Sequence, residues 1–246
     1  MYRDLFIPRL IIAGPYEFLP DNPFLYGIHT LDKRALPPAE SARVALTAYN
    51  LLNVDIGWLS KKSAEWLRRN TGDIPRGFVE VGSEPITRLL ESTAGTLGFV
   101  LFPEGPEPGR SPTPKQIAAV IAAGKSLKDK AVMVVGISPW GYIGERDFLP
   151  AAQGVFDCIL GSGEGVGFPS AVPQKTPSVL WIRPDGAGRS VNILELFVKP
   201  QIGQKIEWIE RTTFGASLEF LGNNHPSDPA MLRVVGSPPP KPSPKP

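Results

Sequence analysis

Residues 130–170 read KAVMVVGISPWGYIGERDFLPAAQGVFDCILGSGEGVGFPS. Two short apolar runs, 131–137 and 155–160, each end in small residues and turn formers. Residues 145–153 between them are long enough for a helix of about two turns. This order predicts a strand, a crossover helix and a second strand. The unbroken apolar character of both runs favours strands that are buried on both faces of a parallel sheet.

The loops after these two strands are where a functional site is expected, because ligands of such sheets bind beyond the carboxyl ends of the strands. The first loop, 138–141, reads SPWG, and the second, 161–165, reads GSGEG. They contain no His, no Cys and one acidic residue, Glu164. The loops therefore offer few of the groups that metal or nucleophilic chemistry requires.

The composition describes a folded chain with little net charge. Of its 246 residues, 42% are hydrophobic, which is enough for a sizeable core. The net charge of +2 gives no electrostatic reason to expect a nucleic-acid partner. No apolar run reaches the roughly 18 residues of a membrane helix, and Pro8 and Arg9 interrupt the N-terminal one. With neither a membrane span nor a signal peptide expected, a cytoplasmic location is the default, and the single cysteine, Cys158, is expected to be a buried thiol.

The remaining elements follow from apolar periodicity and from breakers. Ser60 is an expected helix cap, Thr113 and Gln116 form an expected capping box, and Asp185-Gly186 predicts a hairpin turn. Strands are expected at 9–13, 53–58, 77–82, 86–91, 97–102, 178–182, 190–198, 206–209 and 217–221, and helices at 39–52, 61–69, 114–127 and 226–235.

Three local motifs have alternative interpretations that favour structure over chemistry. The glycines of 161–167 follow a strand, but prolines and no helix follow them, so a loop that lines a cleft is favoured over a phosphate cradle. Residues 124–126 read GKS but lack the other glycine of a P-loop. The two histidines, His29 and His225, lie in separate loops without the spacing of a zinc site.

In the order of its strands and turns, the chain resembles the metal-dependent phosphoesterase domain of the bacterial 5′-nucleotidase and UDP-sugar hydrolase family. This family belongs to the calcineurin-like phosphoesterase superfamily, and the resemblance covers roughly residues 9–198. RLIIAGPYEF, from residue 9, resembles a family strand that ends in Gly-Asp. VMVVGISPWG, from residue 132, resembles the strand that ends in SHLG, and VFDCILGSGEGVGF, from residue 155, resembles the strand followed by GGHSH.

The resemblance implies an α/β fold, a layered sandwich of mixed β-sheets flanked by helices. It also implies that the chain lacks the family's first strand, whose Asp-x-His would lie before Arg9. If an N-terminal segment is missing, the family resemblance implies a periplasmic location.

The family holds two divalent metal ions through Asp, His and Asn at loop ends, and these ions activate a water and clamp the phosphate. By resemblance, the Asp of Gly-Asp is replaced by Pro15, and the Asn-His pair falls near Lys61 and Lys62. The His of SHLG is replaced by Pro139, and both His of GGHSH by glycine. No bound metal or other cofactor is therefore expected. The candidate cleft comprises these positions and their neighbours: Pro15, Lys61, Lys62, Ser138, Pro139, Ser162, Gly163, Glu164 and Gly165.

Two functions remain open from the sequence. The first is a phosphoesterase-like protein that has lost its metal ligands and serves as a binding or assembly module, with a protein partner at the cleft or at the proline-rich tail. The second is an active phosphoester hydrolase that uses atypical residues, such as Glu164, Ser138, Ser162, His29 or the lysines, or that needs a missing N-terminal segment. The expected domains are 1–200, a phosphoesterase-like domain; 201–235, an extension packed on or linked to it; and 236–246, a disordered tail.

Overall fold

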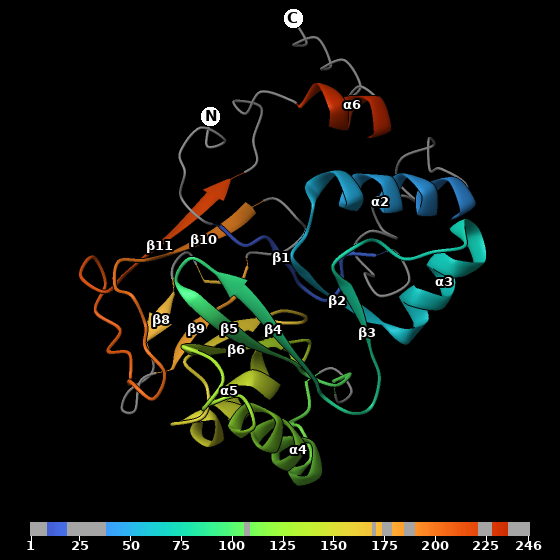
Figure 1. Cartoon of the computed structure of the whole chain (residues 1–246). Coiled ribbons are helices and arrows are strands. Elements are labelled where there is room, and N and C mark those ends of the chain that lie inside the picture. Colours follow the sequence, from blue (N-terminus) through green and yellow to red (C-terminus); the bar gives the residue numbers. More distant parts are fainter. Residues whose placement is uncertain are drawn as a thin grey trace, which may run out of the picture.

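The computed structural model describes residues 9–18, 38–105, 109–168, 171–173, 179–184, 190–220 and 228–235. These residues form a layered α/β structure in which two packed sheets are covered by helices on their outer faces (Figure 1). The described helices are α2 (Pro38–Leu52), α3 (Lys61–Thr71), α4 (Pro114–Lys125), α5 (Gly141–Ala152) and α6 (Pro229–Val235). No described helix is long and apolar enough to cross a membrane.

The larger sheet has six strands in the order β4-β5-β6-β7-β9-β8. Its centre, from β5 to β9, is parallel, and the edge strands β4 and β8 are antiparallel to their neighbours. The predicted strand, crossover helix and strand are confirmed as β6, α5 and β7, because β6 and β7 are parallel neighbours. The strands of this sheet are β4 (Ile86–Ser92), β5 (Gly95–Leu101), β6 (Met133–Ser138), β7 (Cys158–Gly161), β8 (Val172–Pro173) and β9 (Leu180–Ile182).

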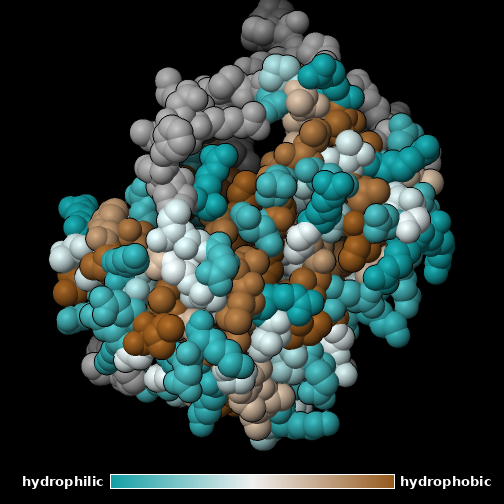
Figure 2. Space-filling view, viewed as in Figure 1, coloured by the Kyte–Doolittle hydropathy of each residue, from teal (hydrophilic) through white to brown (hydrophobic). Residues whose placement is uncertain are grey.

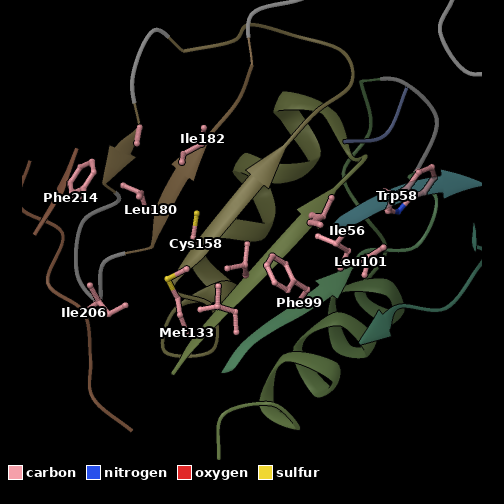
Figure 3. Packing of buried hydrophobic residues seen from close by; sticks show 14 of the residues in the cluster. Ile56, Trp58, Phe99, Leu101, Met133, Cys158, Leu180, Ile182, Ile206 and Phe214 are labelled. Carbon is pink, nitrogen blue, oxygen red and sulfur yellow. The ribbon is translucent and has the colours of Figure 1, made fainter. Parts of the chain in front are cut away.

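One face of this sheet supplies the main hydrophobic core. Figure 3 shows side chains from successive strands projecting from this face, among them Phe99, Met133, Cys158 and Leu180. All four are buried, and Cys158 is completely so. Burial, followed by the nearby charge of Asp157, raises the pKa of the Cys158 thiol. The expectation of a buried thiol is confirmed.

The opposite face packs against α4 and α5. Because side chains alternate along a strand, the neighbours of the core residues point to the helices: Val100, Val134, Ile159 and Trp181. Strands buried on both faces need an unbroken apolar sequence, which is the pattern that predicted β6 and β7.

The second sheet contains β1 (Ile12–Ala13), β2 (Ile56–Ser60) and β3 (Phe78–Val81), all parallel. Ile56 and Trp58 of β2 point into the shared core, as Figure 3 shows, while Leu59 packs with α2 and α3 on the other side. The antiparallel pair β10 (Ser190–Leu196) and β11 (Phe214–Phe220) adds apolar residues to the same core.

The helix ends follow the predicted capping chemistry. The Ser60 hydroxyl accepts a hydrogen bond from the Ser63 amide at 2.9 Å, and Gly72 ends α3 in the left-handed conformation. Thr113 and Gln116 form the expected capping box at the start of α4. Hydrophilic residues cover the outer side of α3, whereas hydrophobic residues gather where α6 meets α2 (Figure 2).

Three sequence-based expectations are wrong. The predicted hairpin between 178–182 and 190–198 does not form, because β9 pairs with β7 and β8, and β10 pairs with β11. Residues 206–209 are not a strand; Ile206 and Trp208 are instead anchored in the core as single side chains. Helix α5 begins at Gly141, four residues earlier than predicted, because its first amides find partners in the glycine loop.

One helical face was also predicted wrongly. The helical spacing of Val44, Ala48, Leu51 and Leu52 in the sequence predicts one apolar face for α2, yet Leu51 and Leu52 are 45% and 44% exposed. Ser41 and Ala42 are the buried residues of this helix. The predictions for His29, His225 and the 236–246 tail concern residues outside the described ranges.

Candidate functional site

A cleft of about 570 Å³ opens where the carboxyl ends of strands from both sheets meet. This volume falls in the range of small-molecule sites. Its lining comes from the segments that follow β1, β2, β5, β6 and β7. The lining residues are Tyr16, Trp58, Ser60, Lys62, Glu104, Gly105, Gly109, Pro139, Trp140, Gly141, Tyr142, Ile143, Glu164, Gly165 and Val166.

The start of α3 forms one side of the cleft. Ser60 ends β2 and caps α3, which places Lys62 within the first turn of the helix. The Glu104 carboxylate accepts a hydrogen bond from the Lys61 amide at 3.4 Å. Glu104 therefore brings a negative charge to a helix N-terminus, where the helix dipole favours it.

Two buried tryptophans give the cleft fixed aromatic walls. The Trp58 indole N–H donates to the Phe102 carbonyl at 2.8 Å, and the Trp140 indole N–H donates to the Pro103 carbonyl at 2.9 Å. Both acceptors lie in the segment after β5, so one backbone stretch orients both rings. The indole nitrogens are thereby satisfied, and the rings, only 4% and 5% exposed, border the cleft with a small apolar surface.

The serines at the ends of β6 and β7 are structural. Ser138 is fully buried, and its hydroxyl accepts a hydrogen bond from the Trp140 amide at 3.1 Å. The Ser162 hydroxyl donates to the Ser138 carbonyl at 2.7 Å. These bonds tie the two strand ends together beneath the cleft.

Arg183 fixes the glycine loop 162–166 from below. It is almost completely buried. Its guanidinium donates to the carbonyls of Ser162, Gly163 and Glu164 at 3.1 Å each. Its Nε donates to the carbonyl of Val166 at 3.0 Å. One side chain therefore orders the whole loop, and nothing in its sequence indicates such an anchor.

The fifth hydrogen bond of Arg183 goes to Glu145, which is fully buried on α5. The Glu145 carboxylate also accepts hydrogen bonds from the Trp181 indole at 2.9 Å and from the Ser162 amide at 3.0 Å. Burial raises the pKa of Glu145 above its ordinary value, and the Arg183 charge opposes that shift. A satisfied ion pair of this kind specifies one loop conformation.

The ring of Tyr16 lies directly above Gly163. The Tyr16 hydroxyl donates to the Pro139 carbonyl at 2.9 Å, which joins the loops after β1 and β6. A Cβ on Gly163 would lie 3.0 Å from the Tyr16 ring, and the glycine has a φ of +82°. Tyr16 itself has a φ of +73°, which is costly for a non-glycine residue.

Tyr142 packs against Gly165 in the way that Tyr16 packs against Gly163. A Cβ on Gly165 would overlap the Cβ of Tyr142, and its φ of +108° disfavours any side chain. The Tyr142 ring stacks on Trp181 at 5.4 Å between centroids. The Tyr142 amide donates to the Glu164 carbonyl at 2.8 Å, so the loop and the start of α5 hold each other in place.

The structure brings together part of the predicted site. Four of the predicted residues line the cleft: Lys62, Pro139, Glu164 and Gly165. Gly163 lies beneath Tyr16, and Pro15, Ser138 and Ser162 are buried near the cleft without lining it. Lys61 is exposed at the first position of α3.

Sequence reasoning missed Tyr16, Ser60, Glu104 and Tyr142 as lining residues. Glu104 could have been found, because it follows β5 at the same edge of the sheet as the predicted loops. The tyrosines gave no comparable signal, because their positions depend on left-handed backbone at Tyr16 and in the glycine loop.

Comparison with solved structures supports the layered fold. The sulfate thiohydrolase SoxB of Thermus thermophilus, solved with glycerol, matches with a TM-score of 0.53 and 14% identity over 73% of this chain. A hypothetical protein, also from Thermus thermophilus, matches with a TM-score of 0.44 and 16% identity over 71% of this chain. The NAD nucleotidase NadN of Haemophilus influenzae matches with a TM-score of 0.48 and 12% identity over 63% of this chain.

This chain spans 35% of the SoxB chain, 63% of the hypothetical protein and 34% of NadN. At these identities the likeness to SoxB shows the fold alone, which is a metallophosphoesterase-like α/β sandwich. No protein-family model and no curated protein matches the sequence.

A fold of this kind implies a metal centre at the loop ends, so the donor groups there decide whether a metal fits. Among the described residues, no group of three or more His, Cys, Asp or Glu side chains is placed to hold a metal ion. The cleft contains the carboxylates of Glu104 and Glu164 together with the ammonium of Lys62. Among the described lining residues, two carboxylates beside an ammonium supply fewer ligands than a two-metal centre needs.

Proposed function

We propose that this protein is a 5′-nucleotidase-like member of the metallophosphatase folds that has lost the two-metal ligands and acts as a non-catalytic binding or assembly module. The observation that carries the proposal is the backbone at Gly163 and Gly165. By resemblance, these positions correspond to two metal-binding histidines of the family. Both have positive φ, and Tyr16 and Tyr142 fill the space that side chains there would need.

This replacement goes beyond the exchange of single ligands. A histidine at either position would have to displace a tyrosine and adopt a strained backbone. The resemblance also assigns Pro15 and Pro139 to ligand positions, and a proline side chain has no donor atom for a metal. The four positions support a site that has been rebuilt as a cleft with a fixed aromatic lining.

The alternative, an active phosphoester hydrolase with atypical residues, receives less support. Ser138 and Ser162 are buried and hydrogen-bonded to backbone groups, so neither hydroxyl faces a substrate. Glu164, Glu104 and Lys62 remain as ionisable groups of the described cleft. The Glu104 carboxylate accepts a hydrogen bond from the Lys61 backbone amide, which is not a nucleophile.

The test measures bound metal and turnover in the same preparation. Elemental mass spectrometry of the purified full chain gives the metal content, and a p-nitrophenyl phosphate assay is run with added Mn²⁺, Zn²⁺ and Mg²⁺. We expect far less than one metal ion per chain and no metal-dependent turnover. Two metal ions per chain together with turnover would show that the ligands lie elsewhere in the chain and would overturn the proposal.

A further inference from the structure

The cleft combines aromatic walls with carboxylates, and this combination indicates a class of ligand. Trp58 and Trp140 are fixed by their indole hydrogen bonds, but they are only 4% and 5% exposed, so the half-buried Tyr16 and Tyr142 offer most of the aromatic surface that a ligand can reach. Tyr142 is fixed by stacking on Trp181 and by an edge contact with Phe168 at 6.3 Å between centroids. Tyr16 is fixed by its hydroxyl. These aromatic side chains lose little freedom when a ligand binds, which favours affinity.

Rigid aromatic grooves are the surfaces on which proline-rich segments bind. A polyproline II segment is extended before it binds, so it loses little entropy, and its rings pack on Trp and Tyr faces. The aliphatic residues Ile143 and Val166 extend the apolar lining, and both are exposed. A ligand made largely of proline rings would cover them.

The charges of the cleft favour a basic ligand. Glu104 and Glu164 contribute two carboxylates, against one ammonium from Lys62. Both glutamates are exposed, so a ligand can reach them. A lysine ammonium would gain from a carboxylate and from a nearby aromatic face at once.

We propose that the cleft binds a proline-rich segment that carries lysine, and that residues 236–246 of this chain are its occupant. This segment reads GSPPPKPSPKP, with six prolines and two lysines in eleven residues. Helix α6, which precedes the segment, packs on α2 and contributes no residue to the cleft. The inference rests on the proposed function, because it assigns an occupant to the same cleft.

A synthetic peptide of residues 236–246 with a fluorescent label tests the proposal against the full-length protein. Fluorescence anisotropy is measured while the protein is titrated into a fixed, low concentration of peptide. We expect saturable binding. A peptide with both lysines replaced by glutamine should bind about fivefold more weakly or worse, because it loses the charge contacts. A peptide with alanine in place of the prolines should bind still more weakly.

Binding measurements on protein variants test whether the peptide binds in the cleft. Glu164→Gln and Glu104→Gln should each weaken binding of the natural peptide several-fold. Glu65→Gln is the matched control, because Glu65 is exposed on α3 and does not line the cleft. It should bind the peptide as the unchanged protein does. Circular dichroism of each variant confirms that loss of binding is not loss of folding.

Three results would overturn the inference. They are the absence of saturable binding, equal binding of the glutamine-substituted peptide, and binding that neither cleft variant weakens. The metal and phosphatase measurements are separate, so the two proposals can fail independently. A metal-free protein that does not bind the peptide would be consistent with the proposed function and would refute only the assignment of residues 236–246 as the occupant.

Discussion

Single residues decide the shape of the cleft, and Gly165 is the most constrained of them. A methyl group there would overlap Tyr142 at a φ of +108°. We expect Gly165→Ala to lower the free energy of unfolding by about 3 kcal/mol, because backbone strain and overpacking add. Urea denaturation followed by circular dichroism measures the change.

Gly72 supplies the control for this variant. It has a φ of +83°, but a Cβ there would meet nothing within 4 Å. Gly72→Ala should therefore cost only the backbone term, about 1 kcal/mol. Equal losses for the two variants would mean that Tyr142 moves aside easily and that the cleft is not fixed by this contact.

The buried pair of Arg183 and Glu145 gives a second prediction at this scale. Removing the guanidinium takes one donor from each of four loop carbonyls, of which Ser162 and Glu164 keep a backbone donor, and leaves Glu145 without its charge partner. We expect Arg183→Met to lower the free energy of unfolding by about 3–5 kcal/mol. The double variant with Glu145→Gln should lose less than the sum of the two single changes, since the uncompensated charge is then gone.

The pH dependence of the Arg183→Met variant has a definite sign. Burial already raises the pKa of Glu145, and the loss of Arg183 removes the charge that opposes the shift. The folded state then binds the Glu145 proton more tightly than the unfolded state does. Stability from that proton is present at low pH and is lost as the pH rises through the folded pKa. The variant should become more stable from about pH 7 to about pH 5, and the variant that also carries Glu145→Gln should not show this gain.

At the scale of elements, the sequence predicted what depends on local pattern and missed what depends on distant partners. Strands β5, β6 and β7 were predictable because burial on both faces requires unbroken apolar runs. The pairing of β10 with β11 was not, because Asp185-Gly186 is a strong hairpin signal that tertiary packing overrides. The early start of α5 depends on carbonyls more than twenty residues away.

The cap of α3 gives a prediction for an element that borders the cleft. Ser60 is buried, and its hydroxyl satisfies the Ser63 amide. Ser60→Ala should lower the free energy of unfolding by about 1–2 kcal/mol, whereas Ser60→Thr keeps the hydroxyl and should cost less. Chemical denaturation of both variants measures the difference. Equal losses of stability for the alanine and threonine variants would show that the capping hydroxyl does not account for the loss.

At the scale of the molecule, the location of the site was predictable and its chemistry was only partly so. The rule that ligands bind beyond strand carboxyl ends led to Pro139, Glu164 and Gly165, and the family resemblance led to Lys62; all four line the cleft. The aromatic lining was not predictable, because Tyr16 reaches the cleft through a strained backbone that no local pattern encodes. The lining of the candidate cleft thus depends on residues that only the assembled fold brings together.

The segment after β10 is part of the same core, and this bears on how the whole chain unfolds. The Trp208 indole donates to the Asp157 carbonyl at 3.0 Å, and its ring packs edge-on against Phe214. Both rings belong to the core cluster that contains Cys158. We therefore expect one cooperative unfolding transition, in which circular dichroism and tryptophan fluorescence coincide.

Trp208→Ala tests this coupling directly. It should lower the free energy of unfolding of the whole chain by about 3–5 kcal/mol, as the loss of a buried aromatic side chain does. Ile209→Ala is the neighbouring control, and it should cost well under about 1 kcal/mol because Ile209 is 44% exposed. Two separate transitions, with Trp208→Ala shifting only the smaller one, would show that residues 201–235 fold as an independent unit. In that case the contacts of Trp208 with β7 would be a docking interface between two units.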